Sequence, residues 1–100
     1  LNQLSLESTK ITDKSMPVIG ALPNLKELDV SLTQVGDAGV LHLKGNNNLT
    51  VLWLTGTKVS DDSERVLITL ANLELLELTA TAMSVPTIQQ VFNALPKLKP

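Results

Sequence analysis

Residues 25–35 read LKELDVSLTQV, and the same arrangement of leucine, threonine and valine returns at residues 49–59 as LTVLWLTGTKV. Further copies occupy residues 1–11 and 73–83, so that the pattern repeats every 24 residues along the chain. A fixed period of this length indicates stacked structural repeats. We therefore predict a single domain, residues 1–100, made of the units 1–24, 25–48, 49–72 and 73–97, with Leu98 opening a fifth.

Each unit begins with a pattern that predicts a short strand. Apolar residues alternate with other residues, so Leu52 and Leu54 should point into the stack while Trp53, between them, points outward. Such a unit cannot cover its own apolar face and does so only by stacking on its neighbours. We therefore expect an α/β fold: a right-handed solenoid in the form of a short arc, with a concave parallel sheet and convex helices.

The second part of each unit predicts a helix. The pairs Thr12-Asp13 and Ser60-Asp61, together with Ser84, provide oxygens for the first turn, and Asp61 with Glu64 fits a capping box. The last helix is the clearest, because its apolar residues form one stripe and it should stop before Pro96. The stripe consists of Ile88, Val91, Phe92 and Leu95.

The LxxLxLxxTx[IV] pattern resembles that of the leucine-rich repeat family over essentially the whole chain. The family usually has asparagine where this chain has threonine, and Thr-bearing units are similar to those of bacterial leucine-rich repeat proteins and F-box-type adaptors. A buried hydroxyl needs a hydrogen-bond partner, so we expect these threonines to bond to loop backbone. No neighbouring group would activate one of them as a nucleophile. The column consists of Thr9, Thr33, Thr57 and Thr81.

The second unit departs from the pattern at residues 44–48, where Asn46 replaces an apolar residue. We expect a shorter helix there, with Gly45 at positive φ after its end and the asparagines in the following turn. Asn48-Leu49-Thr50 also matches the N-glycosylation acceptor, so a turn and a modification site remain alternatives.

Composition excludes several classes of protein. The chain has 8 basic and 10 acidic residues, a net charge of −2, and therefore no basic footprint for nucleic acid or an anionic membrane. It has no cysteine, and its longest apolar stretches are far shorter than the roughly 20 residues of a membrane helix. We expect a soluble domain of unassigned compartment. Because it begins at Leu1 without a leader, we expect an excerpt or a processed form.

Residues capable of chemistry do not form an enzyme site in the sequence. Asp13, Asp37 and Asp61 lie at expected helix starts and suit capping better than a metal ion, and His42 is the only histidine. Asp29 and Glu77 share an outward column but lie two strands, or roughly 10 Å, apart on an open face. We predict no catalytic residue, no metal and no cofactor.

The outward columns instead favour a binding module for a protein or peptide. Trp53, the only tryptophan, stands near the middle of the expected sheet, as an anchor residue would. Five acids against Lys26 alone in the strand segments favour a partner with an apolar centre and a basic rim. The predicted partner-binding residues are Trp53, Val51, Leu75, Asp29, Glu77, Glu27 and Thr55.

Three other interpretations remain open at this stage. The chain could be the substrate-recruiting arm of a larger enzyme or effector, or a purely structural repeat segment. Trp53 could merely cover neighbouring strands or pack on a flanking segment outside this sequence. Because strand edges at both ends of a solenoid invite pairing, we also expect weak end-to-end self-association.

Overall fold

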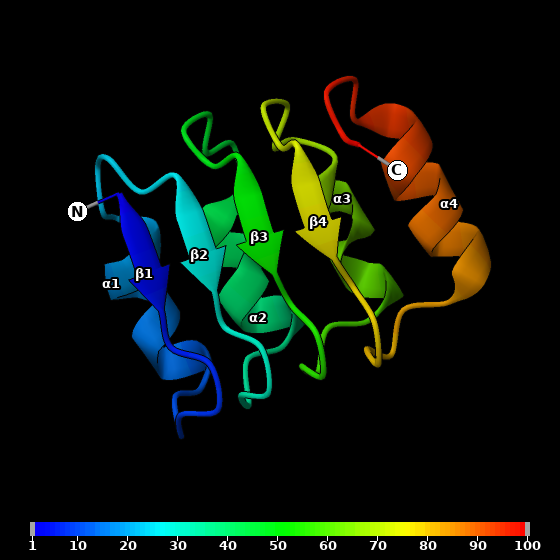
Figure 1. Ribbon diagram of the computed structural model, residues 1–100. Helices are drawn as coiled ribbons and strands as arrows, with labels where there is room; N and C mark the ends of the chain where they lie inside the picture. The colour runs from blue at the N-terminus through cyan, green and yellow to red at the C-terminus, as the bar shows by residue number, and fades with distance from the viewer. Residues whose placement is uncertain (1, 100) are drawn as a thin grey trace.

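The computed structural model describes residues 2–99 as one open sheet with helices behind it (Figure 1). Four parallel strands pair in the order β1-β2-β3-β4. Their bounds are Gln3–Ser5, Glu27–Asp29, Val51–Trp53 and Leu75–Glu77. Between the strands run the short helices α1 (Met16–Gly20), α2 (Asp37–Val40) and α3 (Glu64–Leu67), and the chain ends with the longer α4 (Val85–Ala94).

The strand register follows the 24-residue period of the sequence. Leu28 pairs with Leu52, and Leu52 pairs with Leu76, so each leucine column forms a row across the sheet. Leu52 and Leu54 are completely buried, while Trp53 between them is exposed. The predicted α/β solenoid and its strand alternation are therefore confirmed.

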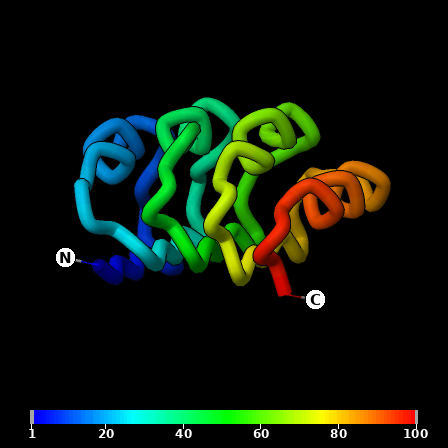
Figure 2. The backbone as a smooth tube through the Cα atoms, turned by 90° about the horizontal axis from the view of Figure 1, so that it is seen from above, coloured from blue at the N-terminus to red at the C-terminus, as the bar shows by residue number. Residues whose placement is uncertain are grey.

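The view from above shows the strands and the helices as two layers (Figure 2). The core residues pack between these layers. The helices of the first three units are single turns that are each joined to a 3-10 turn: η1 (Asp13–Ser15), η2 (Leu41–Leu43) and η3 (Asp61–Ser63). Isolated helices of this length are not stable in water, so packing on the sheet must hold them. Met16, Val40 and Leu67 supply that packing from fully buried positions.

The chain leaves each strand through a left-handed bend at the same column of the repeat. Gly56 has a φ of 68°, and three residues that are not glycine have φ of 57–61°. These are Ser8, Leu32 and Ala80. The next residue is the predicted threonine, whose hydroxyl donates to the carbonyl three residues earlier, as from Thr57 to Leu54 at 2.7 Å. The predicted bonding of the threonines to loop backbone is confirmed in all four units.

The aspartate column has a different role from the predicted one. Asp13, Asp37 and Asp61 do not cap their own helices; each accepts a hydrogen bond from backbone of the next unit. The donors are the N–H groups of Gly36 at 2.6 Å, Ser60 at 2.9 Å and Ser84 at 2.7 Å. The oxygens that do cap belong to Thr12, Ser60 and Ser84, so the capping box of Asp61 with Glu64 was wrong. These aspartates therefore link successive units along the stack.

Asp37 has the richest set of these contacts and gives a prediction for pH. Burial alone would raise its pKa, but the hydroxyls of Ser60 and Ser63 and the Ser60 N–H outweigh burial and lower it. A carboxylate whose pKa is depressed on folding stabilises the fold above its unfolded pKa of about 3.9, and this stabilisation is lost as pH falls through the folded value. We expect the free energy of unfolding to decrease as the pH is lowered below about 4. In Asp37→Asn this decrease with pH should be shallower, as urea denaturation at a series of pH values would measure.

The control for this experiment is Asp62→Asn, because the Asp62 carboxylate accepts no hydrogen bond within residues 2–99. In this variant the free energy of unfolding should depend on pH as steeply as in the wild type. If the free energy of unfolding of Asp37→Asn depended on pH as steeply as that of the wild type, the hydrogen bonds of Asp37 to the next unit would not contribute to stability.

In the second unit, where the repeat pattern breaks, the predicted turn is present but the predicted shortening of the helix is not. Gly45 follows the end of η2 with a φ of 74°, and the Asn46 side chain accepts from the N–H groups of Asn48 and Leu49, as expected of a turn. However, α2 has 4 residues and so does α3, so the second helix is not uniquely short. The loss of one apolar residue after the helix changes the turn rather than the helix.

Gly39 is a position where the close approach of two units requires glycine. A Cβ atom there would lie 2.5 Å from Asp13 Oδ1 and 2.8 Å from Met16 Cγ. Although alanine is the better helix former, we expect Gly39→Ala to lower the free energy of unfolding by about 1–3 kcal/mol through overpacking. Gly36→Ala is the control, because its nearest neighbour would be 3.5 Å away. Equal denaturation midpoints for the two variants would refute this account of Gly39.

Candidate functional site on the open face of the sheet

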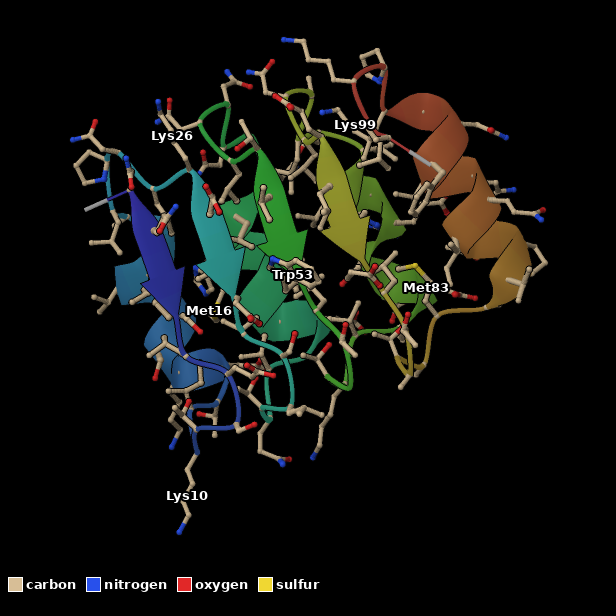
Figure 3. The ribbon with its side chains drawn as sticks, in the orientation of Figure 1. Lys10, Met16, Lys26, Trp53, Met83 and Lys99 are labelled. Atoms are coloured by element: carbon tan, nitrogen blue, oxygen red, sulfur yellow. The ribbon has the colours of Figure 1, made fainter. Side chains whose placement is uncertain are left out.

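The face of the sheet opposite the helices is uncovered, and Trp53 stands on it. Figure 3 shows the indole in front of the strands, on the side away from α1, α2 and α3. Trp53 is 36% exposed, on a face that no other element of residues 2–99 covers. Exposed aromatic groups of this kind are enriched at binding sites.

Two carboxylates flank Trp53 in the same cross-strand row. Asp29 of β2 pairs with Trp53 in register, and Trp53 pairs with Glu77 of β4. Neighbouring strands lie roughly 4.8 Å apart, so the indole has an acid on each side. This row is the geometric centre of the site.

Hydrogen bonds orient the carboxylates of the face. Asp29 Oδ1 accepts from the Ser31 N–H at 2.9 Å, Glu27 accepts from Gln3 Nε2 at 3.0 Å, and Glu77 accepts from the Thr79 hydroxyl at 3.1 Å. None of the three forms an ion pair within residues 2–99, where Lys99 and Glu74 form the salt bridge at 3.6 Å. The face therefore carries fixed negative charge around Trp53 without an internal counter-ion.

Trp53 forms a wall of two shallow hollows, both on the side toward β2. One has a volume of about 360 Å³ and is lined by Gln3, Leu4, Ser5, Glu27, Asp29 and Trp53. The other has a volume of about 350 Å³ and is lined by Glu7, Asp29, Ser31, Leu32, Trp53 and Thr55. Asp29 lines both hollows, together with Trp53.

The predicted site residues separate into two groups. Trp53, Asp29, Glu27 and Thr55 meet at the hollows over β2 and β3. Val51, Leu75 and Glu77 instead line a cavity beside β4. Val51 and Leu75 are also half-buried, so they add less apolar surface beside Trp53 than strand alternation implied.

Sequence reasoning missed Leu32 as a member of the site. Leu32 is 55% exposed and lines, with Trp53, the hollow that also contains Thr55. The positive φ of Leu32 turns the chain at the end of the strand, so simple alternation does not describe its direction. No residue type is common to this column, which is why the bend could not be predicted.

A cavity of about 460 Å³ lies between β4 and α4 rather than at Trp53. Leu76, Leu78, Ile88 and Phe92 give it an apolar wall. Beside it, the Leu78 and Ala80 N–H groups have no acceptor within residues 2–99, although Leu54 and Gly56 at the same columns donate to carbonyls of the next unit. The cavity is thus the end of the stacked core. Its lining also includes the outward residues Val51, Leu75, Glu77 and Thr79, so it reaches the edge of the sheet face, but it does not include Trp53.

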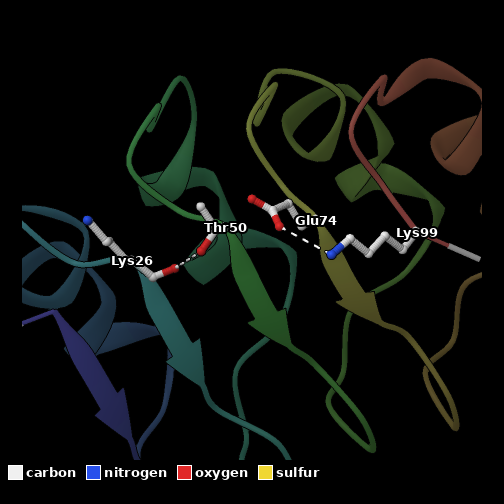
Figure 4. Close-up of polar contacts among 4 residues, drawn as sticks. All are labelled: Lys26, Thr50, Glu74 and Lys99. Atoms are coloured by element: carbon white, nitrogen blue, oxygen red, sulfur yellow. Dashed lines mark hydrogen bonds and ion pairs between the residues drawn. The ribbon is translucent and has the colours of Figure 1, made fainter.

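A second row of residues lies where the chain enters each strand, as Figure 4 shows for Lys26, Thr50, Glu74 and Lys99. The Thr50 hydroxyl donates to the Lys26 carbonyl at 3.3 Å, and the Lys99 N–H donates to the Glu74 carbonyl at 2.9 Å. Lys99 also forms the ion pair with Glu74. Lys26 and Lys99 therefore lie at this rim, apart from the Asp29–Trp53–Glu77 row.

The described part of the chain contains neither a metal-binding cluster nor a helix suited to crossing a membrane. Within residues 2–99, no three His, Cys, Asp or Glu side chains gather as a metal-binding group. His42 is exposed on η2, on the helical side. None of the described helices combines the length and the apolar character needed to cross a membrane.

Comparisons with known proteins agree with this architecture. A family model described as "Leucine Rich repeat" matches residues 21–44, which amounts to one repeat length. A solved structure, leiomodin-1 actin-binding site 2, superposes with a TM-score of 0.68 at 16% sequence identity. The match covers 97% of this chain and 65% of that chain, so the present sequence spans less than two thirds of its structural neighbour. A search of curated proteins finds no match. The comparisons support a leucine-rich repeat fold and no finer relationship.

Proposed function

We propose that this domain is a protein-interaction module that binds a protein or peptide on the open face of the sheet. The observation that carries the proposal is Trp53, an exposed aromatic residue in the middle of a face that no helix covers. Rigid parallel strands fix its position, and binding sites gain affinity when their contact groups are ordered before the partner arrives.

The chemistry of the face indicates the partner. The indole, Thr55 and the half-buried Val51 and Leu75 provide apolar and small contacts, while Glu27, Asp29 and Glu77 provide negative charge. A partner with a basic rim, as predicted from the sequence, complements this surface. Charge of this kind mainly steers encounter, so association should slow as salt concentration rises.

The similarity of fold to a domain named for actin binding supports a protein partner in general, and not actin in particular. The domain could act alone or as the substrate-recruiting arm of a larger enzyme or effector. In both arrangements the contact with the partner is non-catalytic and uses the same face.

Site-specific photo-crosslinking tests which face binds. A photo-reactive amino acid is placed at Thr55 on the sheet face in one protein, and at Leu41, which is 53% exposed on the helical side, in another. After irradiation in lysate of the source cells, we expect a discrete crosslinked species from position 55 and none at that mass from position 41. The same species from position 41 alone would refute binding on the sheet.

A further inference from the structure

We infer that the group recognised at the centre of the face is an arginine side chain of the partner, laid against the Trp53 indole and paired with Asp29. The inference rests on the proposed function. It replaces the apolar group that was expected to contact Trp53 with a cationic one. Three features of the face carry it.

The first feature is the setting of the aromatic ring. An apolar anchor is normally surrounded by apolar neighbours that exclude water. Trp53 instead has Asp29 and Glu77 as its two neighbours in register. An apolar partner group placed here would desolvate both carboxylates without compensating them, whereas a cation over an indole is attracted by the ring and by both acids.

The second feature is uncompensated charge. Glu27, Asp29 and Glu77 are half-buried, and no basic side chain lies within ion-pairing distance of them in residues 2–99. Intramolecular hydrogen bonds fix one oxygen of each carboxylate, and the Ser31 N–H takes only Oδ1 of Asp29. Oδ2 of Asp29 is left without a donor in the described chain, and it belongs to a residue that lines both hollows.

The third feature is shape, which distinguishes arginine from lysine. Trp53 and Asp29 both line each of the two hollows, so a group that enters either hollow lies near the ring and the carboxylate together. A guanidinium is planar, stacks on aromatic faces and donates through several N–H groups at once. An ammonium is a compact and strongly hydrated point charge, and its three N–H donors form no planar fork and do not stack on a ring. The geometry therefore favours arginine.

The experiment uses acetylated and amidated tripeptides, Gly-Arg-Gly and Gly-citrulline-Gly, because citrulline keeps the shape of arginine and removes its charge. Trp53 is the only tryptophan, so its fluorescence reports binding at this one position. We expect the arginine peptide to change the emission saturably, with a dissociation constant at least tenfold lower than that of the citrulline peptide. Equal effects of the two peptides would overturn the inference, as would equal binding of Gly-Lys-Gly.

Variants separate the cationic mechanism from apolar contact. Asp29→Asn should weaken binding of the arginine peptide about tenfold, whereas Asp62→Asn, which removes the same charge from η3, should leave it unchanged. Trp53→Leu retains an apolar side chain and loses the ring, so peptide-observed NMR should show weak binding to it and stronger binding to Trp53→Phe. If Trp53→Leu binds as well as Trp53→Phe, the ring is not a cation platform.

The two proposals can fail separately. If the position-55 crosslink to a partner forms while the arginine and citrulline peptides act alike, the sheet face binds proteins but arginine recognition is refuted. If the crosslink arises only from position 41, the proposed function itself fails.

Discussion

Leu52→Ala is expected to lower the free energy of unfolding by about 2–5 kcal/mol, the largest effect of any single change considered for this fold. Leu52 is completely buried and lies in register between Leu28 and Leu76, so its side chain packs against the units on both sides. Truncation would leave a cavity in the middle of the stack, where a rigid sheet on one side and helices on the other limit collapse. Urea denaturation followed by circular dichroism measures the change.

The matched control is the adjacent residue, Val51, which is half-buried on the open face. Val51→Ala should cost about 1 kcal/mol or less. Equal destabilisation by the two substitutions would contradict the register, because a shift of one residue exchanges the two faces of every strand.

Trp53→Ala is expected to weaken partner binding by about thirtyfold or more, which corresponds to at least about 2 kcal/mol. The indole is the one large aromatic group on the open face, and its removal also opens both hollows that it lines. Calorimetry with the partner identified by crosslinking measures the loss of affinity, and circular dichroism establishes that the variant is folded.

An exposed apolar residue on the helical side provides the comparison for this prediction. Val18 is 71% exposed on α1, and Val18→Ala should leave the affinity within about twofold of wild type. If Val18→Ala weakened binding as strongly as Trp53→Ala, the partner would be contacting the helices.

Much of the fold could be predicted from the sequence because the decisive signals are local and repeated. The inward leucines, the outward Trp53 and the capping residues Thr12, Ser60 and Ser84 all follow from side-chain alternation or from helix-start chemistry, and the structure confirms them. The resemblance to leucine-rich repeats gave the same architecture independently. The partner-binding roles of the face residues remain predictions.

What the sequence did not reveal depends on contacts between units. Asp37 has the residue type of a helix cap, and only the stacked structure brings it to Ser60 and Ser63, 23 and 26 residues further along the chain. The left-handed bend is shared by serine, leucine, glycine and alanine, so geometry rather than residue type defines that column. Val51 and Leu75 likewise line the cavity beside β4 rather than the hollows at Trp53, and only the packed structure shows where that cavity lies.

Quenching of Trp53 fluorescence by acrylamide, with and without the bound partner, tests the central claim most directly. The chain has a single tryptophan, so the measurement reports one position on the open face of the sheet. If the partner binds there, it must cover the exposed part of the indole, and the quenching constant should fall severalfold in the complex. A quenching constant that does not change when the partner is bound would show that the open face remains free, and would contradict the account.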